Sequence, residues 1–290
     1  MDLTNEELED PNVLMIITIV RVGQMDLKDI DKKSISKSKS ENKTTGIRRP
    51  FGVGTISIKD IMSSTVKSNA LVNLKVYRYA NDDPFHRFII RCVNQHFGRE
   101  SHMAQNSLKE LGQILVSYCV LNGSLELIRK TNSELVGQHV GCQIVERRTF
   151  PDVIMPGLYR NDFYILLRSG SFEKSVKQAR SVQVEMSVRV QDNVIPGTFA
   201  HGEFAVPCSY FRSHVYYMEK TPSWMEWVKM RIPVDEFKKA YVLFTFRHRS
   251  TTQSKDKSEQ EFAFAFLPLK SQNGTIQDDD YKVVKMYVCF

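Results

Sequence analysis

The sequence predicts a mainly β protein, with an antiparallel β-sandwich over residues 160–290 preceded by a smaller mixed α/β domain over residues 1–155. Three observations predict this arrangement. At 290 residues the chain is long enough for two domains. After residue 160 short strand-like segments follow one another with turn residues between them and no long helix. Before residue 155 strand-like and helix-like periods alternate, which is typical of a mixed domain.

The N-terminal domain begins with strands on both sides of a polar segment. Residues 12–22 are β-branched and apolar, which predicts a buried strand. Residues 31–45 are rich in Lys and Ser and predict a loop, because they contain almost nothing that could pack in a core. Alternating residues over 48–58 and the run 71–79 predict two more strands.

The period then changes to that of a helix. Phe85, Phe88, Ile89 and Cys92 fall at i, i+3, i+4 and i+7, so residues 85–97 predict a helix with one apolar face, and Asp83 followed by Pro84 predicts its N-cap. A strand over 113–121, a turn at Asn122-Gly123 and a short helix over 124–135 complete the domain.

The C-terminal half predicts seven strands, several of them separated by turn-forming segments. The strand over 181–190 places its valines and Met186 on one face. Strict alternation of Phe262, Phe264 and Phe266 predicts that all three lie in the sandwich core, in preference to a base-stacking platform. The seven predicted strands cover residues 161–168, 181–190, 210–218, 225–232, 240–247, 261–269 and 281–288.

No motif in the sequence favours an enzyme. Gly52-x-Gly54 lacks the third glycine of a dinucleotide fingerprint, and no G-x-x-x-x-G-K-S/T loop is present. The acidic start lacks the features of a secretory signal, so a cytoplasmic protein is expected. The cysteines are odd in number and scattered, which argues against disulfides or a zinc knuckle. We predict no catalysis, no cofactor and no metal site. The five cysteines are Cys92, Cys119, Cys142, Cys208 and Cys289.

Positive charge is concentrated in two segments between predicted strands. Residues 168–257 hold fifteen Lys or Arg against nine Asp or Glu, which accounts for most of the formal net charge of +7. This surplus favours an anionic partner. The first segment carries Arg168, Lys174, Lys177 and Arg180, and the second carries Arg247, Arg249, Lys255 and Lys257. Loops at one end of a sandwich can meet. The alternative is that both loops are merely solvated and keep a sheet edge from aggregating.

The free energy of membrane binding helps to distinguish these alternatives. Diffuse attraction to an anionic leaflet is worth ~1 kcal/mol per basic residue, so durable recruitment needs several cations on one multiply phosphorylated headgroup. Calcium-mediated binding needs several loop carboxylates, whereas these loops offer only Glu173, Asp256 and Glu259. Any membrane binding is therefore predicted to be calcium-independent.

Several long segments resemble the dedicator-of-cytokinesis (DOCK) family. Residues 151–193, YYMEKTPSWMEWVKMRIP and FTFRHRSTTQSKDKSEQEFAFAFLPL are similar to its first homology region, and RRPFGVGTISIKDIM is similar to the region that follows its SH3 domain. The resemblance implies a C2-type sandwich that binds phosphatidylinositol 3,4,5-trisphosphate and brings an exchange factor for Rac-like GTPases to the plasma membrane. The implied headgroup residues are Lys174, Lys177, Arg180, Arg247, Arg249, Lys255 and Lys257. Arg249 is alternatively a structural residue paired inside the sandwich.

The resemblance also implies what this chain lacks. The family's exchange domain and SH3 domain are absent, so a Rac-type GTPase and an ELMO-type adaptor are expected to bind only other parts of full-length relatives. The sandwich is expected to lack its last strand, which indicates a fragment or a truncated isoform. The competing functional hypothesis is a protein-interaction scaffold with solvated basic loops. Nucleic-acid binding is not predicted.

Overall fold

The computed structural model describes eleven ranges of the chain. They are residues 5–23, 46–63, 70–80, 83–99, 108–118, 123–131, 162–172, 181–200, 208–249, 261–270 and 284–288. Within them no helix has the length and apolar character needed to cross a bilayer.

The protein is mainly β, as predicted, and its described elements divide into two units. The first unit holds α1, α2, α3 and α5 and most of β1–β4. The second holds β5–β13 and α7 together with the end of β1 and residues Ile47–Pro50 at the start of β2. The sequence-based boundary between residues 155 and 160 stays a prediction.

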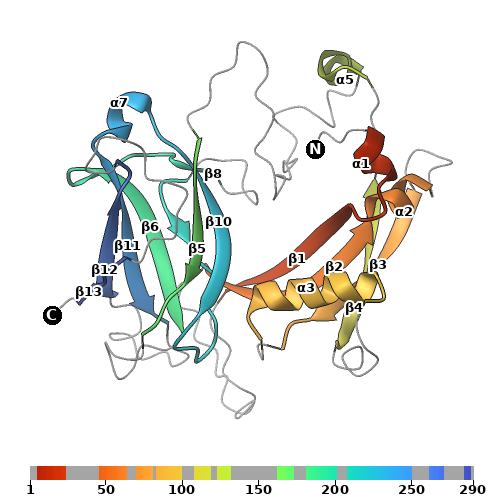
Figure 1. Cartoon of the computed structure of the whole chain (residues 1–290), viewed down its shortest axis with the longest axis horizontal. Helices are drawn as coiled ribbons and strands as arrows, with labels where there is room; N and C mark the ends of the chain where they lie inside the picture. Colours follow the sequence, from red (N-terminus) through yellow and green to blue (C-terminus); the bar gives the residue numbers. More distant parts are fainter. Residues whose placement is uncertain are drawn as a thin grey trace, which may run out of the picture. The chain divides into compact units, whose positions relative to one another are not determined.

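The first unit contains a four-stranded sheet in the order β1-β2-β3-β4. Figure 1 shows α3 along one face of this sheet. The predicted strands and both predicted helices are present, although α5 is described only as far as Thr131. The elements are α1 (Asn5–Glu9), β1 (Leu14–Gly23), β2 (Ile47–Ser57), α2 (Ile58–Ser63), β3 (Ala70–Arg78), α3 (Phe85–His96), β4 (Glu110–Tyr118) and α5 (Leu125–Thr131).

Helix α3 buries the predicted face, with Phe85, Phe88, Ile89 and Cys92 all buried. The predicted cap is wrong. Pro84 is the N-cap and no side chain caps the helix, while the carboxylate of Asp83 lies 3.6 Å from Arg91. The Asp83 carboxylate thus pairs with Arg91, eight residues later, and does not cap the helix.

The two glycines of the incomplete dinucleotide fingerprint have a packing role. A Cβ atom at Gly52 would lie 2.9 Å from the carbonyl oxygen of Tyr77, and one at Gly54 would overlap the side chain of Leu74. These glycines allow β3 to lie close against β2.

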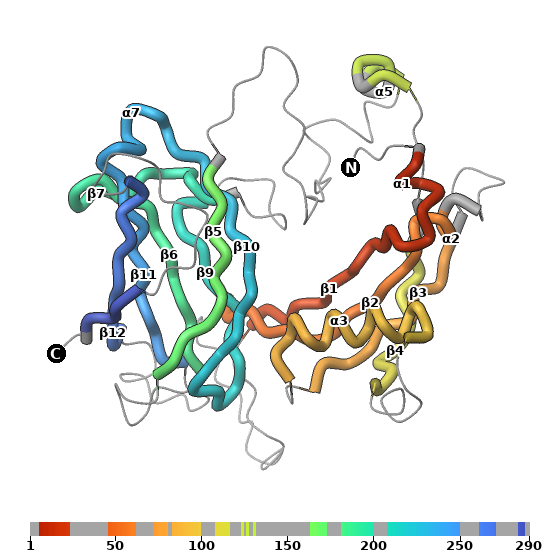
Figure 2. Tube along the Cα trace, viewed as in Figure 1, coloured from red at the N-terminus to blue at the C-terminus, as the bar shows by residue number. Residues whose placement is uncertain are grey.

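The second unit is an antiparallel sandwich of two sheets (Figure 1). One sheet has the order β5-β10-β8, and the other has the order β13-β12-β11-β6-β7, with β9 also paired to β6 (Figure 2). The elements are β5 (Asp162–Ser169), β6 (Val182–Val190), β7 (Asn193–Val194), β8 (Phe199–Ala200), β9 (Phe211–Arg212), β10 (Ser223–Arg231), α7 (Val234–Phe237), β11 (Ala240–His248), β12 (Glu261–Pro268) and β13 (Tyr287–Val288).

Two predicted strands are much shorter in the structure. Of residues 210–218 only Phe211–Arg212 form a strand, because the amide of Val215 donates instead to the carbonyl oxygen of Arg48 at 2.8 Å. Of residues 281–288 only Tyr287–Val288 are a described strand. Whether the sandwich lacks a last strand stays a prediction.

The core prediction for β12 is wrong at Phe264 and Phe266. These side chains point outward with 38% and 45% exposure, while Ala263 and Ala265 are buried. The alanines lie opposite Phe246 and Phe244 of β11, whose large rings fill the interior and leave room only for small neighbours. Phe262 sits at an irregularity in the register and packs on Phe246, as expected of a core residue.

Candidate functional site

Both basic loops start and end at one end of the sandwich. The first loop precedes β6 and the second follows β11, and these strands pair so that Val182 lies opposite His248. Just beyond this pair the amide of Arg249 donates to the carbonyl oxygen of Ser181 at 3.0 Å. Arg249, the last described residue before the second loop, therefore bonds directly to Ser181, the first described residue after the first loop.

Ser181 is fixed by more than this one bond. Its φ of +57° lies in the left-handed region, which is uncommon for a residue other than glycine. Its hydroxyl accepts a hydrogen bond from the amide of Met218 at 2.9 Å. A backbone conformation of this kind persists only when surrounding contacts hold it, so the exit of the first loop is firmly positioned.

The other two loop ends meet in a cluster of aromatic rings. Phe172, the last described residue before the first loop, is 1% exposed. Its ring lies 5.6 Å from Phe246 near the end of β11, 5.9 Å from Phe262 at the start of β12, and 6.3 Å from Trp224, all in edge-to-face geometry. One buried ring thus joins the bases of both loops.

The approach to Phe172 is also held by the backbone. The amides of Gly170 and Phe172 donate to the carbonyl oxygens of Pro222 and Lys220 at 3.0 and 3.1 Å. A Cβ atom at Gly170 would lie 2.9 Å from the ring of Phe172 and 3.1 Å from that of Trp224, so this position requires glycine for close packing.

Five of the seven predicted headgroup residues lie outside the described residues. These are Lys174, Lys177, Arg180, Lys255 and Lys257. The structure describes the loop ends on which they depend, and the remaining two cations, Arg247 and Arg249, lie within it.

Arg249 is 8% exposed, and its guanidinium is directed at an amide side chain. Its Nε and Nη2 atoms donate to Oε1 of Gln183 at 2.9 and 2.6 Å. Gln183 itself is 1% exposed. This contact links the entry of the second loop to β6 through an amide oxygen, as the alternative of a structural, internally paired Arg249 expects.

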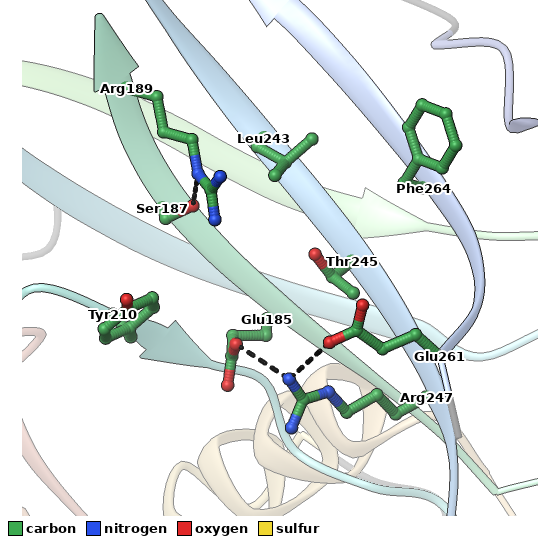
Figure 3. Close-up of a pocket in the computed structure, with 9 residues that line it drawn as sticks. All are labelled: Glu185, Ser187, Arg189, Tyr210, Leu243, Thr245, Arg247, Glu261 and Phe264. Atoms are coloured by element: carbon green, nitrogen blue, oxygen red, sulfur yellow. Dashed lines mark hydrogen bonds and ion pairs between the residues drawn. The ribbon is translucent and has the colours of Figure 1, made fainter. Parts of the chain in front are cut away.

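Arg247 lies between two carboxylates on the outer face of the six-stranded sheet (Figure 3). Its Nη2 atom is 2.6 Å from Oε1 of Glu261 and 3.2 Å from Oε1 of Glu185. Glu185 also accepts a bond from Nε of Arg212 at 2.8 Å. The positive charge of Arg247 is therefore already balanced locally.

These groups line a polar pocket of about 420 Å³. Ser187, Arg189, Tyr210 and Thr245 also line this pocket (Figure 3). Within it, Nε of Arg189 donates a hydrogen bond to the hydroxyl of Ser187 at 3.2 Å. Two carboxylates in the pocket oppose the entry of a phosphate.

The described residues contain no cluster of three or more His, Cys, Asp or Glu that could hold a metal ion. Calcium independence stays a prediction.

Sequence reasoning missed Phe172 and Glu185. The signal for Phe172 was available, since a large apolar residue in a loop of Gly, Ser and cations has a reason to be buried. Glu185 carried no such signal, because a carboxylate on an alternating strand usually faces solvent. Its role depends on Arg212 and Arg247, which are distant in sequence.

Both halves of the chain match models of known protein families. Residues 156–289 match the family described as the C2 domain in Dock180 and Zizimin proteins, and residues 1–151 match the DOCK N-terminus. The chain belongs to the DOCK family. The resemblance drawn from the sequence is confirmed, and so is the C2-like sandwich.

Individual relatives align along almost the whole chain. Human dedicator of cytokinesis protein 3 is 31% identical over 99% of this chain, and mouse dedicator of cytokinesis protein 4 is 32% identical over 98% of it. The aligned region spans only 14% and 13% of the length of these two relatives. Activities of the whole relatives are therefore not established for this chain.

Proposed function

We propose that this chain is a membrane-recruiting part of a DOCK-type exchange factor, and that it binds phosphatidylinositol 3,4,5-trisphosphate through its two basic loops. The observation that carries the proposal is the joining of the loop bases by the Ser181–Arg249 hydrogen bond and the Phe172 aromatic cluster. Loops held at adjacent bases can direct their cations at one ligand.

The charge of the loops suits a headgroup with several phosphates. Lys174, Lys177 and Arg180 stand in one loop, and Lys255 and Lys257 stand in the other. At ~1 kcal/mol each, diffuse attraction of these five cations to a leaflet amounts to roughly 5 kcal/mol, which corresponds to submillimolar binding. Useful affinity therefore requires charge-assisted bonds to one headgroup, which adjacent loops make geometrically possible.

Arg247 and Arg249 remain predicted headgroup residues. Each already has a partner, so each would give up a contact with Glu185, Glu261 or Gln183 in order to reach a phosphate. In the absence of such an exchange they support the loop bases. Binding is proposed to be calcium-independent, because the loops supply few carboxylates.

The larger role follows the family resemblance. Exchange on Rac-like GTPases would be carried out by another part of a full-length relative, and this chain would contribute location and not catalysis. We expect the protein to be cytoplasmic and to be recruited peripherally to the plasma membrane. The alternative is a scaffold or truncated isoform whose basic loops are only solvated.

Liposome sedimentation tests the proposal with a matched control. The whole chain is mixed with neutral liposomes with and without the trisphosphate lipid, in calcium and in chelator. Lys174→Ala/Lys177→Ala should lose most of the lipid-dependent pelleting. Lys238→Ala/Lys239→Ala removes the same charge just before β11, at the strand end remote from the loops, and should pellet like the unmodified chain. Equal pelleting of all three proteins on both liposomes would refute lipid recognition by the loops.

A further inference from the structure

The outer face of the six-stranded sheet carries aromatic rings where a solvated strand usually carries polar side chains. Phe264, Phe266 and Tyr287 are 38%, 45% and 48% exposed. The ring of Tyr287 stacks against both phenylalanines, with centroid distances of 5.5 and 5.8 Å and interplanar angles of 24° and 10°. Three rings on two strands therefore form one ordered apolar surface, which we call the aromatic column.

A groove of about 520 Å³ runs beside this column. Leu243, Phe264 and Phe266 supply apolar lining. Three cations also line the groove, and no Asp or Glu is among its lining residues in the described part of the chain. The cations are Lys238, Lys239 and Lys270. The groove thus combines an apolar surface with three positive charges and no acid among its described lining residues.

We propose that this groove binds an acidic peptide segment of a protein partner. Apolar side chains of the peptide would pack on the aromatic column, and its carboxylates would pair with Lys238, Lys239 and Lys270. Aromatic anchors beside a polar, charged rim are the usual composition of a protein-binding surface. Charge complementarity sets the sign of the partner.

Other occupants fit the observations less well. A second copy of this chain docked face to face on the same groove would bring two sets of lysines together, and like charges in an interface are costly. A flat bilayer would not fill a groove, but an extended segment with protruding side chains would.

The groove is separate from the basic loops. Ala240, which lines the groove, lies opposite Val190, whereas His248 at the loop end lies opposite Val182. The lysine end of the groove is eight residues of strand from the loop end, roughly 26 Å, and its nearest lining residue on β11, Leu243, is five residues from His248, roughly 17 Å. Lipid and peptide can therefore be tested independently on the same protein.

The test uses the whole chain and a fluorescein-labelled peptide of alternating Glu and Leu, with an alternating Lys and Leu peptide as the charge control. Fluorescence anisotropy should show salt-sensitive binding of the acidic peptide only. Phe266→Ser and Lys238→Ala/Lys239→Ala should each weaken this binding roughly tenfold or more. Trp227→Ser removes another exposed aromatic, 52% exposed on β10 of the other sheet, and should leave binding unchanged.

The lysine variant keeps the aromatic column intact, so it tests the idea even where Phe266→Ser perturbs folding. Lys174→Ala/Lys177→Ala should bind the peptide normally while losing lipid. Absence of acidic-peptide binding up to roughly millimolar concentration would overturn the proposal. Unchanged affinity of the lysine variant for the acidic peptide would also overturn the proposal. If Phe266→Ser abolished only pelleting on phosphatidylserine vesicles, the groove would instead be assigned to a membrane.

Discussion

Truncation of Phe172 should loosen the bases of both loops without removing any charge. In Phe172→Ala the buried ring that contacts Phe246, Phe262 and Trp224 is lost. The first loop then loses its fixed entry, while Lys174 and Lys177 remain in the sequence. We therefore expect weaker pelleting on trisphosphate liposomes from a change that leaves the net charge at +7.

The cost to stability follows from the burial of the ring. A Phe→Ala change at a fully buried site costs about 3–5 kcal/mol, because apolar contacts are lost and a cavity remains. Phe172 is 1% exposed and makes three edge-to-face contacts, so the upper part of this range is expected. Domains commonly have about 5–15 kcal/mol of stability, so the variant should still fold.

Tryptophan fluorescence during urea unfolding measures this cost selectively. Both tryptophans of the chain, Trp224 and Trp227, lie on β10 of the second unit, so the signal reports the sandwich. Phe264→Ala is the matched control, because it makes the same change on an outward side chain with 38% exposure and should cost about 1 kcal/mol. Equal destabilisation by the two variants, or normal lipid pelleting by a destabilised Phe172→Ala protein, would refute the reasoning.

Three further predictions concern single side chains. Glu185→Gln should cost about 1–3 kcal/mol in urea unfolding, because Arg247 loses a charged partner, and it should strengthen trisphosphate binding only if Arg247 contacts phosphate. Glu226→Gln should cost about 3–5 kcal/mol, because the carboxylate lies 3.6 Å from the buried guanidinium of Arg48; a loss below about 1 kcal/mol would show that this ion pair is not important. Burial raises the pKa of Tyr77 above its ordinary value of 10.0, so its contribution to stability is present below pH 10 and is lost as the pH rises toward the folded-state pKa. Tyr77→Phe should reduce alkaline destabilisation of the first unit, measured by circular dichroism.

Local periodicity was sufficient to predict most of the elements. The i, i+3, i+4, i+7 spacing from Phe85 specified a helix and its buried face, and the alternation over 181–190 specified β6, because side-chain periods of 3.6 and 2.0 are properties of the backbone itself. The DOCK relationship was also visible, since it rests on strings of residues and not on their positions in space.

Local periodicity could not show that Asp83 does not cap α3, or that most of residues 210–218 do not form a strand. In each case a distant or competing partner decided the outcome: Arg91 pairs with Asp83, and Arg48 bonds to Val215. Such partners are set by tertiary packing, which a local pattern does not contain.

The sequence by itself determined that the chain has a β-sandwich with two clusters of positive charge, because strand period and charge are written residue by residue. Only the tertiary structure decided which face of β12 is inside. Phe and Ala alternate there, and both are apolar, so hydrophobicity does not distinguish the faces. The rings of Phe244 and Phe246 already occupy the interior, which leaves space for Ala263 and Ala265 and places Phe264 and Phe266 outside. The same cross-strand pairing brings Ser181 to Arg249 and so joins two loops that are far apart in the chain.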